Sequence, residues 1–169
     1  MLVEQSNNVV PMPLCTAADD HDPLLQDGGP IEGAHAVVIG DGGLSVLCAL
    51  IRGGAAAAAE LQLSDRSPAE PVELAILPNV LSREAASRAI SLACRSLLPC
   101  GRIVVRVSAD LHEDRIGVGE VTSLLRQNGF TMLRTRAADG ATVISAERPL
   151  FHSARVPERR SERGRVAHG

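Results

Sequence analysis

The stretch that decides the fold is AHAVVIGDGGLSVLCALIRGG, which runs from Ala34 to Gly54. An apolar run over residues 36–39 meets the turn Gly40-Asp41-Gly42-Gly43, and a second apolar run over residues 44–51 has helical spacing. A strand, a glycine turn and a helix in this order open a parallel α/β domain and form a cradle for a nucleotide-like ligand. The same residues also fit a tight turn that needs glycine for packing alone.

Strand and helix patterns alternate along the rest of the chain. Strands are predicted over residues 36–39, 72–77, 102–107, 130–136 and 142–148, and helices over residues 44–52, 82–97 and 119–128. The stretch 55–63 is ambiguous, because its alanines favour a helix while its end alternates like a strand. Ala138-Asp139-Gly140 is a hairpin signal between the last two strands. We therefore expect a mostly parallel sheet with one antiparallel strand at or near an edge.

The composition of the 169 residues favours one domain with loose ends and excludes several kinds of chemistry. Aromatic residues make up 1% of the chain, so aliphatic side chains must fill the core and few side chains can stack on bases. All 17 basic residues are arginine, which indicates a high-GC genome and removes Schiff-base and P-loop lysine chemistry. The net charge of −3 gives no reason to expect nucleic acid as a partner.

The two ends of the chain differ in charge. Residues 1–30 hold five acids and no arginine and are predicted to form an acidic N-terminal arm. Residues 151–169 hold five arginines and are predicted to form a basic, mobile tail. Between them, residues 31–150 are predicted to form the α/β domain.

The cysteines are scattered without a Cys-x-x-Cys pair, which favours a reducing compartment. No signal peptide and no apolar run of transmembrane length is apparent, so we expect a cytoplasmic protein that does not contact membranes.

Three stretches resemble the class I S-adenosylmethionine-dependent methyltransferases. Residues 36–45 are similar to the family's glycine-rich first motif, and residues 72–107 to its fourth strand, the following helix and its fifth strand. Leu98-Pro99-Cys100-Gly101-Arg102 stands where the family often has Leu-Lys-Pro-Gly-Gly, and residues 124–149 are similar to its last helix and last two strands. The resemblance implies a three-layer, Rossmann-like α/β sandwich with a terminal antiparallel strand.

The resemblance also implies S-adenosylmethionine as cofactor and a set of residues that would bind it. The implied set is Gly40, Asp41, Gly42, Gly43, Asp65 and Asn79. Asp65 would accept hydrogen bonds from the ribose, because it follows Gly42 by 23 residues, near the usual spacing of about 20. Glu60 is the second choice. As a turn residue in Ser64-Asp65-Arg66-Ser67, Asp65 needs no ligand, and we favour that interpretation. Asn79 would position a substrate, although a helix N-terminal residue or a simple loop amide is the favoured interpretation.

The chain departs from the family pattern at several points. Val38 and Ile39 stand where an acid often precedes the turn, and the third glycine of the motif falls on Leu44, or on Gly43 if one residue is deleted. Residues 68–71 lead straight into the family's fourth strand, so the region around strand three is predicted to be missing. Only Leu77-Pro78-Asn79 stands where a catalytic tetrapeptide is expected.

These departures leave two function hypotheses open. The first is a methyltransferase that acts on a small molecule or a protein, with no catalytic residue that the sequence can name. The second is a non-catalytic module that dimerises or docks a protein partner through the sheet edge left by the missing strand. A nucleotide-binding Rossmann protein of another family is a weaker third, because of the terminal hairpin. No metal is expected, since Asp19-Asp20-His21-Asp22 and His112-Glu113-Asp114 lack a second ligand cluster.

Overall fold

The computed structural model describes residues 22–68, 70–108 and 115–150. Within them six strands form one sheet in the order β2-β1-β3-β4-β6-β5. The strands are β1 His35–Ile39, β2 Ala57–Leu61, β3 Val72–Leu77, β4 Leu97–Ser108, β5 Thr131–Ala138 and β6 Ala141–Glu147, and the helices are α1 Pro23–Gly28, α2 Leu44–Arg52, α3 Arg83–Ser96 and α4 Val118–Gln127. The neighbours from β2 to β4 pair in parallel, whereas β6 is antiparallel to both β4 and β5. The predicted mixed sheet is confirmed.

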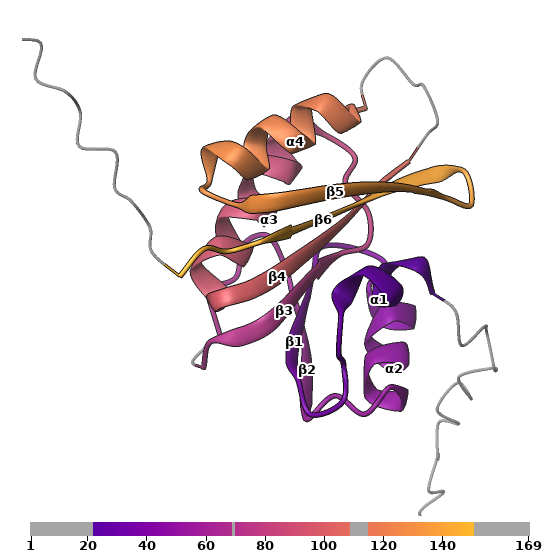
Figure 1. Cartoon of the computed structure of the whole chain (residues 1–169), viewed down its shortest axis with the longest axis vertical. Coiled ribbons are helices and arrows are strands. Elements are labelled where there is room, and N and C mark those ends of the chain that lie inside the picture. Colours follow the sequence, from indigo (N-terminus) through magenta and orange to yellow (C-terminus); the bar gives the residue numbers. More distant parts are fainter. Residues whose placement is uncertain (1–21, 69, 109–114, 151–169) are drawn as a thin grey trace, which may run out of the picture.

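Helices cover both faces of the sheet (Figure 1). Helices α1 and α2 lie on one face and α3 and α4 on the other, so the molecule has three layers. The alternation of strand side chains produces this division. In β1, Val37 and Ile39 belong to the core under α3 and α4, while Ala36 and Val38 belong to the core under α1 and α2. None of the helices in the described ranges is long and apolar enough to cross a membrane.

The ambiguous stretch 55–63 contains strand β2. Its five residues pair in parallel with β1, from His35 opposite Ala57 to Ile39 opposite Leu61. This ladder outweighs the helix preference of the alanines, because tertiary pairing routinely overrides intrinsic propensity. No strand in the described part of the chain pairs with the outer edge of β2. The predicted loss of the region around strand three is therefore visible as an open sheet edge.

The structure differs from the predicted domain limits at the N-terminus. Residues 23–28, which the sequence places in the acidic arm, form helix α1 and bury Leu24 to 1% exposure against the sheet. The Asp22 side chain caps this helix by accepting a hydrogen bond from the Leu24 amide, and Pro23 occupies its first position. Residues 1–21 and 151–169 lie outside the described residues.

The first turn of α2 lies very close to β1. A Cβ atom built on Gly43, the N-cap of α2, would lie 2.5 Å from Cγ1 of Val38, a side chain with no solvent exposure. Valine is stiff at χ1 and cannot swing away in a packed core. Gly43 is therefore the glycine that permits close packing of helix on strand, which is the role of the third glycine in such motifs. From the sequence, that third position could fall on Leu44 or on Gly43.

Replacing Gly43 with alanine tests this packing. We expect Gly43→Ala to lower the free energy of unfolding by about 1–3 kcal/mol through overpacking, since the backbone angles of Gly43 suit any residue. Gly119→Ala in α4 is the matched control, because a Cβ there meets nothing within 4 Å. The control is expected to be neutral or stabilising by up to about 1 kcal/mol in denaturant unfolding. Equal unfolding midpoints for Gly43→Ala and the wild type would contradict the packing argument.

Candidate functional site

A pocket of about 360 Å³ opens at the carboxyl ends of β1, β3 and β4, on the face that α1 and α2 cover. Ligand sites of parallel α/β sheets lie at this end of the strands. The lining residues are Asp22, Leu24, Asp41, Gly42, Ser45, Val46, Pro78, Asn79, Arg106, Ser108 and Arg115. Asp41, Gly42 and Asn79 of the sequence-predicted set therefore lie at one pocket.

The glycine turn forms one wall of this pocket. Gly40 and Gly42 have φ angles of 98° and 79°, and a Cβ on either would meet nothing within 4 Å. Both positions need glycine for the backbone conformation and leave open space above it. The first amides of α2 have no intrahelical acceptor, and its N-cap Gly43 offers them no side-chain acceptor. Backbone donors and the positive end of the helix dipole thus border the pocket at Ser45 and Val46.

Asp65 lies apart from this pocket. Its Oδ2 accepts a hydrogen bond of 2.7 Å from the Gln62 amide, and its own amide donates to the Gln62 carbonyl at 2.9 Å. The carboxylate therefore closes a local turn, as the favoured interpretation of the sequence has it. Strand β2 ends at Leu61, so the first residue beyond the strand is the exposed amide Gln62.

Glu60, the second choice of the sequence analysis, lies closer to the glycine turn. It pairs in register with Val38 of β1, and its Oε1 lies 3.5 Å from the Cβ position on Gly43. The carboxylate is exposed. Among the acids considered from the sequence for the ribose, Glu60 is thus the one that reaches the turn.

Two arginines of the pocket were missed by the sequence analysis. Arg106 belongs to β4, and Arg115 lies shortly before α4. A signal for Arg106 was present, because it interrupts the apolar run of Arg102-Ile103-Val104-Val105-Arg106-Val107. The acids Asp22 and Asp41 line the same pocket from α1's cap and the glycine turn, so both signs of charge are present.

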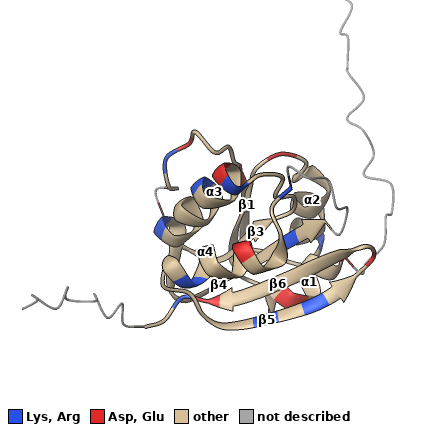
Figure 2. Ribbon diagram, turned by 90° about the horizontal axis from the view of Figure 1, so that it is seen from above, with Lys and Arg blue, Asp and Glu red and all other residues tan. Residues whose placement is uncertain are grey.

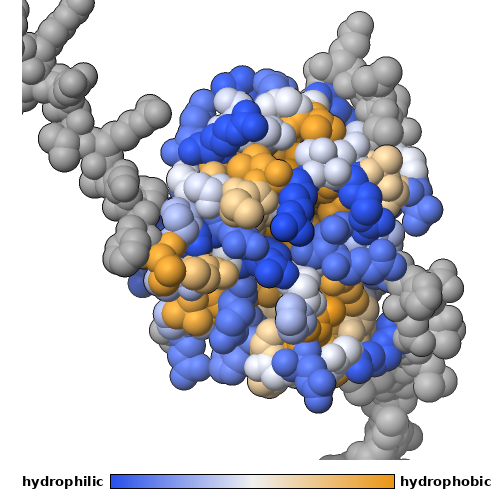
Figure 3. All heavy atoms as spheres, in the orientation of Figure 1, coloured by the Kyte–Doolittle hydropathy of each residue, from blue (hydrophilic) through white to orange (hydrophobic). Residues whose placement is uncertain are grey.

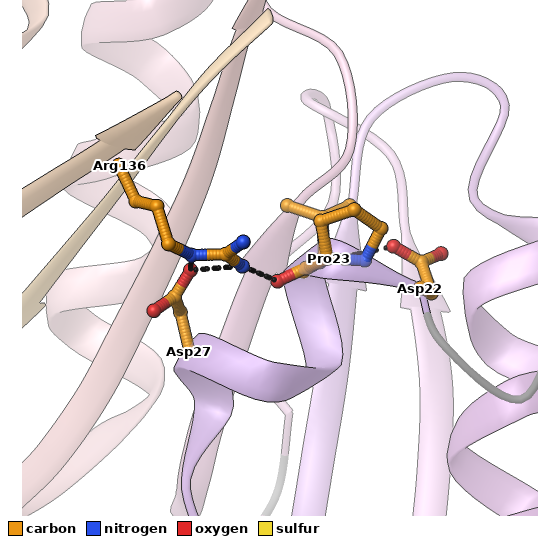
Figure 4. Close-up of polar contacts among 5 residues, drawn as sticks. Asp22, Pro23, Asp27 and Arg136 are labelled. Atoms are coloured by element: carbon orange, nitrogen blue, oxygen red, sulfur yellow. Dashed lines mark hydrogen bonds and ion pairs between the residues drawn. The ribbon is translucent and has the colours of Figure 1, made fainter. Parts of the chain in front are cut away.

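Helix α1 is held in place by an arginine from the far end of the chain (Figure 4). Arg136 of β5 donates to Oδ2 of Asp27 at 2.8 Å and 3.1 Å and to the Pro23 carbonyl at 3.0 Å. Figure 2 shows an acidic position of α1 beside a basic position of β5. A second arginine, Arg102, donates to the Gly28 carbonyl at 3.1 Å. Because Asp22 and Leu24 line the pocket, these contacts fix one of its walls.

Within residues 22–68, 70–108 and 115–150, no group of three or more His, Cys, Asp or Glu side chains is placed to hold a metal ion. Asp19-Asp20-His21 and His112-Glu113-Asp114 lie outside the described residues.

Comparison with known proteins relates the fold to methyltransferases. No family model and no curated protein matches the sequence. A S-adenosylmethionine-dependent methyltransferase from Mesorhizobium loti matches with a TM-score of 0.60 and 14% identity, over 78% of this chain and 99% of the other. An O-methyltransferase family protein from Burkholderia thailandensis matches with a TM-score of 0.59 and 12% identity, over 72% and 53%.

A third solved structure contains the cofactor. The magnesium protoporphyrin IX methyltransferase from Synechocystis PCC 6803, solved with bound S-adenosylmethionine, matches with a TM-score of 0.56 and 16% identity, over 74% of each chain. The chain spans about half the length of the Burkholderia protein, 53% of it. These likenesses show that the chain has the class I methyltransferase fold, as the sequence predicted.

The contacts of Arg136 lead to a prediction about α1. In Arg136→Gln the Asp27 ion pair and the bond to Pro23 are lost, and hydrogen exchange of the α1 amides is expected to rise about five- to tenfold. Arg134→Gln is the control, since Arg134 lies two residues away on the same strand and its side chain has no hydrogen-bond or ion-pair partner among the described residues. Exchange measured by NMR or mass spectrometry checks this. Equal exchange in both variants would show that Arg136 does not hold the helix.

Proposed function

We propose that this chain binds S-adenosylmethionine at the pocket beside the glycine turn and acts as a methyltransferase. The observation that supports this most is the position of the pocket in the sheet. Strand β1 leads into α2 on one face, whereas β3 leads into α3 on the other, so the connections diverge between these two strands. Such a switch point is where open α/β sheets bind ligands, and the pocket lies there.

The residues at the pocket fit the amino-acid end of the cofactor. Backbone amides at the turn and the start of α2 suit its carboxylate. Asp22 and Asp41 suit its ammonium and sulfonium charges. When bound, the cofactor supplies an electrophilic methyl group. The chain would hold that group in line with the acceptor, and such alignment alone lowers a barrier substantially.

The adenosine end would lie toward β2. Asp65 is engaged in its own turn, whereas the Glu60 carboxylate is exposed and reaches the glycine turn. We propose Glu60 as the acid that accepts hydrogen bonds from the ribose. With no strand beyond β2 in the described ranges, this end of the site would be open to solvent.

The same open edge favours the alternative function of a binding module. Strand β2 leaves its outer backbone groups unpaired within the described residues, and the α2 side chains Leu44 and Ile51 are 62% and 59% exposed. Figure 3 shows apolar residues mixed with polar ones across the molecule. A chain that binds no cofactor but self-associates in sedimentation experiments, with Leu44→Ser restoring the monomer, would favour this alternative.

Calorimetric titration with S-adenosylhomocysteine tests the proposed site. Gly42→Val adds a branched side chain at the pocket and strains a positive φ, so we expect binding to weaken at least about tenfold. Gly33→Val is the control, because Gly33 has a similar φ of 75° and open space but precedes β1 at the opposite end of the strand. The control should lose stability and keep its affinity. No binding by the wild type at millimolar ligand contradicts the proposal.

The choice between the two acids is tested by the same titration. We expect Glu60→Gln to weaken S-adenosylhomocysteine binding about fivefold, because charge-assisted hydrogen bonds to the ribose are lost. Asp65→Asn is expected to stay within about twofold of the wild type, since its carboxylate serves the turn with Gln62. A larger loss of affinity in Asp65→Asn than in Glu60→Gln would indicate that Asp65 binds the ribose.

A further inference from the structure

Arg106 is a charged residue in a central strand of the sheet. Strand β4 lies between β3 and β6, and the neighbours Val104, Val105 and Val107 are 2% exposed or less. A strand covered on both faces is normally a continuous apolar run. Arg106 is nevertheless exposed, because it lies where β4 reaches the pocket.

The direction of the Arg106 side chain follows from the alternation of β4. Val104 belongs to the core under α1 and α2, so Arg106, two residues further, lies on the same face of the sheet. There it lines the pocket together with Asn79 and Ser108. Within the described residues the Arg106 side chain has no hydrogen-bond or ion-pair partner. Its guanidinium therefore borders the pocket with its donors available.

The strand register places Arg106 level with the glycine turn. Val38 lies opposite Ile76, and Leu77 lies opposite Val105. Continuing the first pairing by two residues places Gly40 level with Pro78, and continuing the second by one residue places Pro78 level with Arg106. Gly40, Pro78 and Arg106 therefore form one row across the sheet. Adjacent strands are about 4.8 Å apart, so the arginine lies about 10 Å across the sheet from the turn.

The charges of the pocket are divided along this row. Asp41 belongs to the glycine turn and Asp22 to the cap of α1, whereas Arg106 belongs to β4 and Arg115 to the segment beyond it. Asp22 also caps α1, so its carboxylate is fixed at that side. The turn side of the pocket, with its backbone amides and two acids, suits the amino-acid end of the cofactor, which carries both signs of charge, and the β4 side suits an anion.

We propose that Arg106 binds an anionic oxygen group, a carboxylate or a phosphate, of the methyl acceptor. This inference rests on the proposed function, because it assigns the turn side to the cofactor and the β4 side to the acceptor. A guanidinium presents forked N–H donors that match both oxyanions. The acceptor is therefore an acidic molecule whose anion lies at β4.

The experiment follows the arginine Nε–Hε signals of the ¹⁵N-labelled full chain by NMR at constant ionic strength. Inorganic phosphate and benzoate are titrated separately, each with and without saturating S-adenosylhomocysteine. The variants are Arg106→Gln, Arg106→Lys, which keeps the charge without the fork, and Arg95→Gln as the control. Arg95 is exposed in the last turn of α3, on the opposite face of the sheet. A thermal melt of each variant confirms folding.

We expect the Arg106 signal to shift saturably with at least one probe, both with and without S-adenosylhomocysteine. Signals of other residues lining the pocket should follow the same titration and report binding in the variants. Arg106→Gln should weaken the probe at least about tenfold and Arg106→Lys less, while Arg95→Gln stays within about twofold. The affinity of Arg106→Gln for S-adenosylhomocysteine should be unchanged. The probe that binds more tightly identifies carboxylate or phosphate.

Two results would overturn the inference. One is the absence of any saturable shift at Arg106 with either probe. The other is a tenfold loss of S-adenosylhomocysteine affinity in Arg106→Gln together with displacement of the probe by that ligand, which would assign Arg106 to the cofactor's own carboxylate. If S-adenosylhomocysteine fails to bind while the probes still shift Arg106, the proposed function fails and the anion site stands.

Discussion

The close contact between the start of α2 and strand β1 is the constraint on which the site depends. A Cβ on Gly43 would lie 2.5 Å from Val38, so the helix can begin there only without a side chain. To reach that position from Ile39, the chain turns through Gly40 and Gly42 with positive φ angles. This turn leaves backbone amides beside open space at the carboxyl end of the sheet. One packing requirement thus produces both the entry to the helix and one wall of the pocket.

The fold was largely predictable because its signals are local. Apolar periodicity and glycine turns indicate most strands and helices, and the order of the elements predicts a mixed sheet. Helix α1 was missed because six residues are too few for a periodic pattern. Its position depends on Arg136, which follows Asp27 by 109 residues. A contact between residues so far apart in the sequence cannot be recognised from the local sequence of α1.

The candidate site was less predictable, because it depends on strand ends, register and facing. Asp65 was proposed by counting residues from the glycine turn, yet β2 ends at Leu61 and Asp65 lies in the turn that follows. Register with β1 instead brings Glu60 to Gly43. The significance of Arg106 also needs knowledge of which face of β4 borders the pocket. The sequence shows that an arginine interrupts an apolar run, but the position of that arginine at the pocket follows only from the arrangement of the sheet.

The central claim is that the glycine turn binds the cofactor. Hydrogen exchange of the wild-type chain with and without S-adenosylhomocysteine tests it most directly, because protection maps a ligand to the backbone amides that it covers. The account predicts added protection over residues 40–47 and 79–80, with unchanged exchange in α3 and β5. Binding that protects α3 or the β5 edge and leaves residues 40–47 unchanged would contradict the account.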